Sequence, residues 1–286
     1  MHILISVNDS IKLAMEKSEE LAKWLDDRGI TSQIITSGDM PLHTEKTRHL
    51  FSFMQNVDLV VTLGGDGTML ATTQTLFEKA VPMVGFNFGT LGFLTSARSE
   101  QLFTGMQDVL DGKMVKKPRG ALRIRITGDD GKSVDCHALN ELALTRGHYG
   151  RMLRFNTLIN GEPLAESRAD GIIVSSPSGS TAYALSAGGP IVSPEIDCMI
   201  IVSLAPHSLV SRAFLASGDD TVTILPKNGS HVECGLFVDG HNIEMSSDPK
   251  QIEVTTVPNA IEILGYANKS FSAAAANAFF GGSNAI

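Results

Sequence analysis

A glycine-rich turn with a single carboxylate is the segment of this sequence best suited to chemistry. The apolar run 60–63 ends at Gly64, and Gly65, Asp66 and Gly67 follow directly. Few side chains obstruct the backbone here, so its N–H groups could approach an anion directly. A helix that starts after the turn would add the positive end of its dipole. One acid among such amides indicates chemistry on a phosphate, or on a hydroxyl group beside one.

A second candidate segment covers residues 170–190. It begins as a strand and continues as a dense run of serine, threonine, alanine and glycine around Tyr183. The backbone and hydroxyl groups of such a run suit the edges of a planar base and its sugar, while Tyr183 offers a flat face. An ordinary Ser/Gly-rich loop is the alternative, but the segment is apolar at both ends, unlike a flexible linker.

The elements that must position the glycine turn alternate between strand and helix up to about residue 98. Apolar strands are predicted at 3–7, 57–63 and 81–86, and helices at 45–55 and 68–79. Such a series predicts a doubly wound α/β domain, in which ligands bind at the carboxyl ends of the strands. The glycine turn lies at one of those ends.

A further helix is predicted at 101–110, and beyond it the pattern is that of half-buried strands, with apolar and charged residues alternating around Leu122. The pairs Asp130-Gly131, Asn160-Gly161 and Asp239-Gly240 are hairpin signals. The sequence therefore predicts an N-terminal doubly wound α/β domain followed by a mostly antiparallel all-β domain.

Composition excludes several classes of protein. The 286 residues are 43% hydrophobic and 19% charged, which suits a globular protein large enough for two domains. A net charge of −8 argues against a large basic face for nucleic acid or anionic lipid. The apolar runs are too short to span a membrane, and no signal peptide is apparent. The three cysteines are well separated and form no CxxC pair, which indicates reduced thiols, so we expect a cytoplasmic protein. The sequence contains no GxxxxGK[ST] motif, which excludes a P-loop NTPase.

Taken together, these residues resemble the NAD kinase family. The resemblance is carried, in the family's order, by Gly64-Gly65-Asp66-Gly67-Thr68, Gly89-Thr90-Leu91-Gly92-Phe93-Leu94, Asn140-Glu141, Asp170-Gly171, Ser178-Gly179-Ser180-Thr181-Ala182-Tyr183, Gly188-Gly189-Pro190-Ile191, Pro206-His207-Ser208-Leu209 and Asp239-Gly240. The glycine–aspartate turn is shared with diacylglycerol kinases, whereas the block 178–190 is more specific.

The resemblance implies an enzyme that transfers a phosphoryl group from ATP or polyphosphate to the 2′-hydroxyl of the adenosine ribose of NAD, making NADP. Asp66 would be the general base or would orient the attacking hydroxyl, and the loose transition state of phosphoryl transfer favours the orienting role. The donor phosphates, bridged by Mg²⁺, would bind at Gly64, Gly65, Gly67 and Thr68. No metal ligands from protein side chains are expected.

The resemblance assigns NAD to a second set of residues. Asn140 and Glu141 would bind the adenosine end, with Glu141 accepting from ribose hydroxyls. Asp170 would contact the nicotinamide end, which in the family lies near a subunit interface, so a homo-oligomer (dimer or tetramer) is expected. The adenine pocket would be lined by Ser178, Thr181, Ala182, Tyr183 and Ser186. The implied domains are 1–98, 99–265 for NAD binding, and a C-terminal segment 266–286 that in the family returns to the N-terminal domain.

Three further residues have two interpretations each. Arg168 could supply a cation to phosphates or be an ordinary surface arginine. His241 could approach the transferred phosphate or be a solvated residue at a hairpin. Phe86 could pack near the nucleotide or belong to the core.

Two other functions stay open on the residues alone. A lipid kinase of the diacylglycerol or sphingosine type shares the glycine turn, but it would leave the block 178–183 unexplained. It also needs access to a bilayer, and the sequence contains no basic amphipathic helix or lipid-anchor motif. A non-catalytic dinucleotide sensor could share the fold, although the presence of Asp66, Asn140 and Glu141 argues against it.

Overall fold

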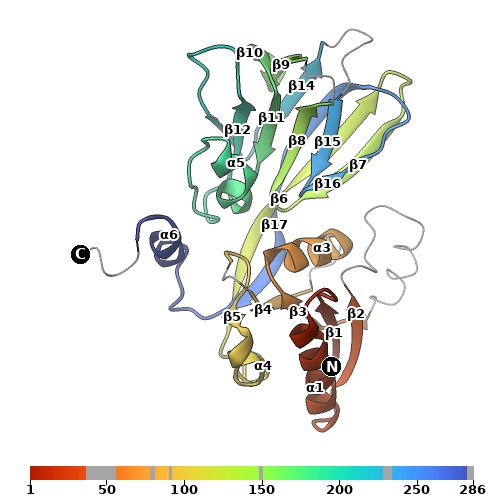
Figure 1. Cartoon of the computed structure of the whole chain (residues 1–286), viewed down its shortest axis with the longest axis vertical. Coiled ribbons are helices and arrows are strands. Elements are labelled where there is room, and N and C mark those ends of the chain that lie inside the picture. The colour runs from red at the N-terminus through yellow and green to blue at the C-terminus, as the bar shows by residue number, and fades with distance from the viewer. Residues whose placement is uncertain (37–55, 78–80, 90–91, 148–150, 228–233, 282–286) are drawn as a thin grey trace. The chain divides into compact units, whose positions relative to one another are not determined.

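The computed structural model describes residues 1–36, 56–77, 81–89, 92–147, 151–227 and 234–281. The chain folds into two compact units, the first made of 1–118 with 260–286 and the second of 119–259. Two long strands, β6 (Val115–Gly128) and β17 (Pro249–Gly265), each have residues in both units (Figure 1). The domain boundaries at residues 98 and 265, which were inferred from the sequence, stay a prediction.

The first unit is built on a parallel sheet in the order β2–β1–β3–β4, with the end of β17 beside β4. The strands β1, β3 and β4 are mostly apolar and buried, as expected when a parallel sheet is covered by helices, whereas the edge strand β2 is partly exposed. The predicted helix 45–55 lies outside the described residues. The elements of this unit are β1 (His2–Val7), α1 (Lys12–Asp26), β2 (Thr31–Thr36), β3 (Leu59–Gly64), α3 (Asp66–Leu76), β4 (Met83–Asn87), β5 (Ala97–Arg98), η3 (Ser99–Gln101), α4 (Leu102–Leu110) and α6 (Phe271–Phe279).

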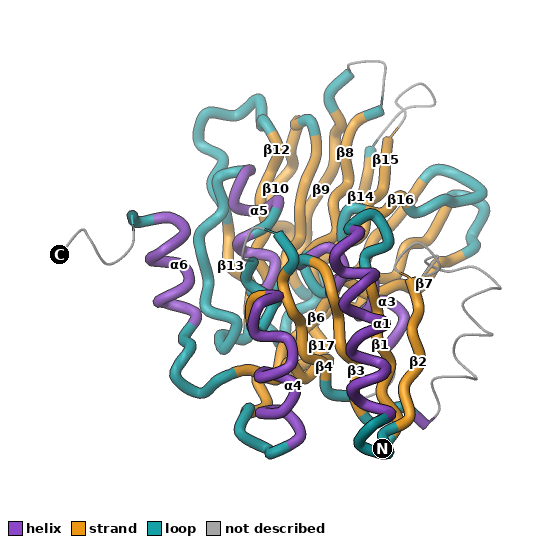
Figure 2. The backbone as a smooth tube through the Cα atoms, turned by 60° about the horizontal axis from the view of Figure 1, so that its bottom comes forward, coloured by secondary structure: helices purple, strands orange, loops and turns teal. Residues whose placement is uncertain are grey.

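The second unit contains a six-stranded antiparallel sheet in the order β13–β12–β11–β8–β15–β16. A further set of antiparallel strands, β10–β9–β14–β17, supplies Phe155 and Ile224 to the same buried core as Leu144 and Ile172. In Figure 2 this unit is almost entirely strand and loop. Its other elements are β7 (Ser133–Ala138), β8 (Glu141–Arg146), β9 (Leu153–Ile159), β10 (Glu162–Ala169), β11 (Gly171–Ser175), η4 (Ser178–Thr181), α5 (Tyr183–Ser186), β12 (Cys198–Leu204), β13 (Phe214–Ser217), β14 (Val222–Pro226), β15 (Cys234–Val238) and β16 (His241–Asn242).

The hairpins predicted from short sequence signals are confirmed. Asn160 and Gly161 join β9 to β10 with φ of 51° and 84°, the left-handed pair that a two-residue turn needs. Asp239 and Gly240 join β15 to β16 in the same way, with φ of 47° and 81°. An α/β unit followed by an antiparallel all-β unit confirms the predicted fold class.

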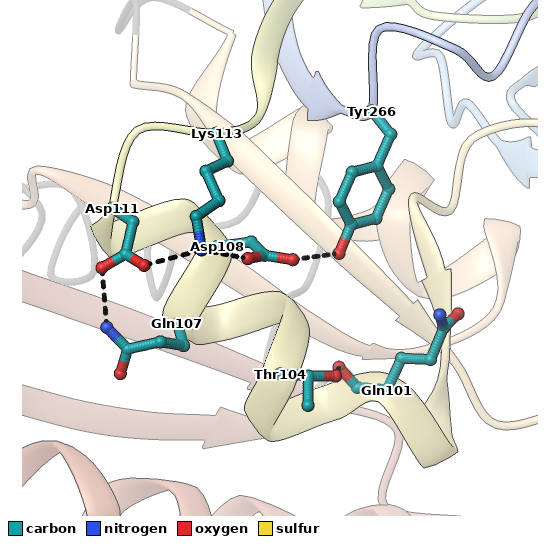
Figure 3. Close-up of polar contacts among 7 residues, drawn as sticks. All are labelled: Gln101, Thr104, Gln107, Asp108, Asp111, Lys113 and Tyr266. Carbon is teal, nitrogen blue, oxygen red and sulfur yellow. Dashed lines mark hydrogen bonds and ion pairs between the residues drawn. The ribbon is translucent and has the colours of Figure 1, made fainter.

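The C-terminal segment is attached to the first unit by polar contacts as well as by the sheet (Figure 3). The Tyr266 hydroxyl donates a hydrogen bond to the Asp108 carboxylate at 2.8 Å. The Lys113 ammonium lies 3.0 Å from Asp108 and 2.9 Å from Asp111, and these contacts lower the pKa of both carboxyls. The end of α4 therefore binds the chain that follows β17.

Candidate active site

Asp66 is the first residue of α3, and its carboxylate fixes the residues that follow a second glycine turn, Gly89-Thr90-Leu91-Gly92 in the sequence, to the first turn at 64–67. Gly65, extended at φ −125° and ψ −165°, leads from β3 into the helix. One carboxylate oxygen accepts the backbone N–H of Phe93 at 2.7 Å, and the other accepts that of Leu94 at 3.1 Å. Each oxygen keeps a further acceptor site. The carboxylate is therefore held in place and can still accept a hydrogen bond from a hydroxyl group.

Two glycines of this site are required by packing. A Cβ on Gly64 would lie 2.1 Å from the Thr68 hydroxyl oxygen, and a Cβ on Gly92 would lie 2.2 Å from the Asp66 carboxylate. A side chain at Gly64 would displace Thr68 within the first turn, and one at Gly92 would push the second turn away from Asp66. The middle of the second turn, residues 90–91, lies outside the described residues.

Packing does not require glycine at positions 65 and 67. Among the described residues no heavy atom lies within 4 Å of a Cβ built at either position, and neither backbone has a positive φ. The hydroxyl oxygen of neighbouring Thr68 is buried and has no hydrogen-bond partner among those residues. Open backbone at a helix N-terminus beside an unpaired donor fits an anionic ligand such as a phosphate.

In the second unit, one carboxylate fixes the turn that carries Asn140 and Glu141. The Asp239 side chain is only 7% exposed, and it accepts the backbone N–H groups of Leu139, Asn140 and Glu141 at 2.8, 2.8 and 3.0 Å. The N–H of Asp239 in turn donates to the Glu141 carbonyl at 3.0 Å. Three N–H groups on one buried carboxylate hold the start of β8 rigidly.

The side chains of Asn140 and Glu141 are buried yet incompletely paired. Within the part of the chain that the structure describes, Asn140 Oδ1 and Glu141 Oε2 have no hydrogen-bond partner. Burial, and next the charge of Asp239, raise the pKa of Glu141 to about 8, against a hydrogen bond from the Tyr183 N–H that lowers it. Near neutral pH this carboxyl is therefore largely protonated, and it can both donate and accept. Buried unpaired oxygens are costly unless a ligand satisfies them.

The segment 175–186 packs on the same turn. A Cβ on Gly179 would lie 2.4 Å from the Asn140 carbonyl oxygen, and the Ser175 hydroxyl donates to that oxygen at 3.1 Å. Ser180 is structural, because its hydroxyl bonds both backbone groups of Val192. Tyr183, which donates its N–H to Glu141, has a ring that is 45% exposed. The predicted base-binding residues lie on η4 and α5 or between them: Ser178, Thr181, Ala182, Tyr183 and Ser186.

Asp170 and Arg168 lie elsewhere in the second unit. The Asp170 carboxylate is 2.9 Å from Arg146 Nε, so it has a cationic partner that the sequence did not indicate. Arg168 is exposed on β10, and its carbonyl oxygen accepts the N–H of His207.

His241 and Phe86 have different surroundings. His241 is exposed on β16, and its Nδ1 lies 3.1 Å from the carbonyl oxygen of Asp239, the residue that fixes the Asn140–Glu141 turn. Phe86 is fully buried in the core of the first unit, where a Cβ on Gly105 would meet its ring at 2.7 Å. The structure thus places Phe86 among core residues.

Comparison with known proteins assigns both units. Residues 3–114 match the family model of the ATP-NAD kinase N-terminal domain, and residues 139–265 match that of the ATP-NAD kinase C-terminal domain. The chain belongs to the NAD kinase family. Its activity is that of an NAD kinase, a phosphotransferase that converts NAD to NADP. The first match includes Asp66 and its glycines, and the second includes Asn140, Glu141 and Tyr183.

Relatives and solved structures agree with this family. The chain is 36% identical to the NAD kinase of Heliobacterium modesticaldum over 236 residues, 82% of this chain and 83% of the relative. It is 32% identical to that of Nitrosomonas europaea over 255 residues, 88% and 85% of the two chains. Yeast NADH kinase complexed with NADH has the same fold, with a TM-score of 0.87, 23% identity and coverage of 100% and 89%. An NAD kinase from Archaeoglobus fulgidus in complex with ATP matches with a TM-score of 0.71 and 22% identity, and the match covers 94% of both chains.

In this NAD kinase, the contact of Asp239 with the turn at 139–141 is a feature that the sequence did not indicate. The pair Asp239-Gly240 is fully accounted for as a hairpin turn, and the residues that Asp239 binds lie about 100 positions away. The sequence did indicate that Asp239 matters, because Asp239-Gly240 is part of the pattern that the chain shares with the family. Across the described residues, no helix is long and apolar enough to cross a membrane.

Proposed function

We propose that this NAD kinase transfers the terminal phosphoryl group of ATP to the 2′-hydroxyl of the adenosine ribose of NAD. The observation that carries the proposal is the fixed carboxylate of Asp66 beside the open backbones of Gly65 and Gly67. An acceptor for a hydroxyl proton and a site for phosphate thus occur within one turn. ATP is the donor that the family description names, and polyphosphate is the alternative donor to be tested.

The donor phosphates bind at the N-terminus of α3, on the backbones of Gly64, Gly65, Gly67 and Thr68. The unpaired Thr68 hydroxyl and the helix dipole favour negative charge there. These groups fit a phosphate that carries Mg²⁺, because Mg²⁺ usually keeps waters and phosphate oxygens with few protein ligands. Bound Mg²⁺ would neutralise the charge that develops on the phosphoryl group. Of the described residues, no three His, Cys, Asp or Glu side chains form a metal-binding group.

Asp66 orients the ribose hydroxyl for attack. Two backbone N–H bonds fix the direction of its carboxylate, which can accept a hydrogen bond from the hydroxyl. Phosphoryl transfer has a loose transition state, so correct placement of the attacking oxygen supplies most of the rate. The proton is released to the carboxylate or to water as the new P–O bond forms and the bond from the terminal phosphorus to the bridging oxygen of ATP breaks, with ADP as the leaving group.

NAD binds through the second unit. Asn140 and Glu141 offer unpaired buried oxygens to the adenosine end, where the protonated Glu141 can donate to one ribose oxygen and accept from another hydroxyl. Ser178, Thr181, Ala182, Tyr183 and Ser186 line the adenine pocket. The Asp170 carboxylate, held by Arg146, contacts the nicotinamide end. His241 and Arg168 remain candidates for contact with phosphates. The enzyme is proposed to act in the cytoplasm as a dimer or tetramer.

A coupled endpoint assay tests this function. Purified protein is incubated with NAD, ATP and Mg²⁺, and NADP is measured with an NADP-specific dehydrogenase. The proposal expects NADP that depends on the donor, the metal and Asp66. NADP formed only with polyphosphate would change the donor, and no NADP with either donor despite NAD binding would favour a dinucleotide sensor. Failure to bind NAD would favour a lipid kinase.

A further inference from the structure

Phe93, whose backbone N–H helps to fix the Asp66 carboxylate, is itself held by the C-terminal helix α6. Phe93 donates its backbone N–H to the Asp66 carboxylate at 2.7 Å. The ring of Phe93 is stacked on that of Phe279, with centroids 5.6 Å apart and planes at 8°. It also meets Phe271 at 5.9 Å in a tilted arrangement. Both partners belong to α6, so one residue joins this helix to Asp66.

The spacing of residues in α6 allows two of its side chains to pack against one aromatic ring. Phe271, Ala275 and Phe279 are four residues apart and therefore share one face of the helix. Two turns of helix separate the phenylalanines by about 12 Å along the axis, which leaves room for the Phe93 ring between them. Ala275, the buried residue of α6, has a side chain small enough to leave that space open. Ser270 caps the helix by accepting the N–H of Ala273 at 3.2 Å.

A second set of contacts joins the same two segments a few residues further on. The Ser96 hydroxyl donates to the carbonyl oxygen of Leu264, at the end of β17. The Lys269 ammonium donates to the carbonyl oxygen of Ser96 at 3.2 Å. The stretch 92–96 is therefore held by Asp66 on one side and by the C-terminal segment 264–279 on the other.

We propose that α6 is a positioning element for Asp66, which acts by holding Phe93 and, through its backbone, the two N–H groups that fix the carboxylate. The inference rests on the proposed role of Asp66. Phe271 and Phe279 are positioning residues, because neither touches the carboxylate. Loss of their contacts frees the ring of Phe93, so the N–H groups of Phe93 and Leu94 no longer have one fixed direction. The Asp66 carboxylate then takes up a range of orientations, and fewer of them place the attacking hydroxyl correctly.

This role differs from a contribution to stability. Phe279 is 40% exposed, so its removal costs the fold less buried surface than the loss of a fully buried phenylalanine. Turnover should fall while the protein stays folded. The NAD-binding residues Asn140 and Glu141 belong to the other unit, so KM for NAD should not follow kcat.

The chain provides a matched control, because Phe280 is the next residue and is 70% exposed. Phe279→Ala, Phe279→Tyr and Phe280→Ala are compared in kcat, KM for NAD and thermal unfolding. Phe279→Ala should lower kcat by about 10-fold with KM for NAD nearly unchanged and the protein still folded at the assay temperature. Phe279→Tyr, which keeps a ring for stacking, and Phe280→Ala should behave like the wild-type enzyme. Should Phe279→Ala not fold, Phe271→Ala takes its place.

Two results would overturn the inference. One is an equal kcat for Phe279→Ala and Phe280→Ala, and the other is a loss of kcat fully explained by unfolding at the assay temperature. Asp66→Asn is measured in parallel to separate this failure from that of the proposed function. An active Asp66→Asn enzyme would contradict the role of Asp66 itself. An inactive one beside a fully active Phe279→Ala enzyme would contradict only the role of α6.

Discussion

Replacing Asp239 by asparagine tests how the NAD-binding turn is held. Asp239 Oδ1 accepts the N–H groups of Asn140 and Glu141, while Oδ2 accepts that of Leu139 at 2.8 Å. Asparagine keeps one oxygen, so the bonds to Asn140 and Glu141 can persist in weaker, uncharged form. Its NH₂ group would face the N–H of Leu139, and two donors cannot bond. Asp239→Asn is thus a nearly isosteric change that breaks one bond of three.

The expected cost follows from that geometry. A hydrogen bond to a charged group contributes about 1.5–3 kcal/mol, and a buried donor left unpaired costs about 1–3 kcal/mol. Because the two terms overlap for one N–H group, we expect Asp239→Asn to lower the free energy of unfolding by about 3 kcal/mol. The freed turn should also raise KM for NAD by about 10-fold and leave KM for ATP unchanged. Removing the charge of Asp239 should lower the pKa of Glu141 from about 8.

Urea unfolding followed by circular dichroism, together with steady-state kinetics, measures both effects. Asp219→Asn is the control, because Asp219 is exposed in the turn between β13 and β14 and the same charge is removed. Equal unfolding free energies for the two variants, with an unchanged KM for NAD, would refute the idea that Asp239 holds the turn.

The remaining predictions concern pH, the donor turn and the C-terminal attachment. Because the pKa of Glu141 is raised to about 8 from 4.5, the folded protein binds its proton more tightly than the unfolded chain. The stability that this proton provides is present below about pH 4.5 and is lost as pH rises through about 8, with a slope of up to about 1.4 kcal/mol per pH unit. Glu141→Gln should abolish that slope in unfolding measured from pH 5 to 9, and an unchanged profile would contradict the raised pKa. Gly67→Ala should keep or raise stability, by up to about 1 kcal/mol for a helical position, while raising KM for ATP; Gly64→Ala should destabilise the fold by contact with Thr68. Equal KM for ATP in Gly67→Ala and wild type would mean that the open backbone does not bind the donor. Tyr266→Phe, which removes the hydrogen bond to Asp108, should lower the unfolding temperature slightly without changing kcat, and a wild-type temperature would mean that this bond contributes nothing.

The parts of the fold that the sequence predicted are those set by local signals. The strand and the helix around Asp66 follow from an apolar run that stops at Gly64, although the observed helix begins at Asp66 and not at the predicted residue 68. The Asn160-Gly161 and Asp239-Gly240 turns are determined by the left-handed backbone that these residues tolerate. In each case a few neighbouring residues decide the conformation.

The parts that the sequence could not predict depend on contacts between distant positions. Asp239 binds the turn at 139–141, and nothing within its own hairpin indicates that partner. The helix α6 packs on Phe93, and nothing within its alanine-rich sequence indicates that distant partner. Phe86 was open to two interpretations because an apolar residue near a glycine turn can face either the core or a ligand.

The role of Asp66 is tested most directly by kcat and NAD affinity in Asp66→Asn. Asparagine has nearly the same size, but its NH₂ group would oppose the N–H of either Phe93 or Leu94. The account predicts that kcat falls by at least about 100-fold while the Kd for NAD, measured by calorimetry, changes only a few-fold. Near-normal turnover would contradict the assignment of Asp66 as the residue that orients the ribose hydroxyl. Loss of NAD binding together with turnover would show that Asp66 serves binding and not the transfer step.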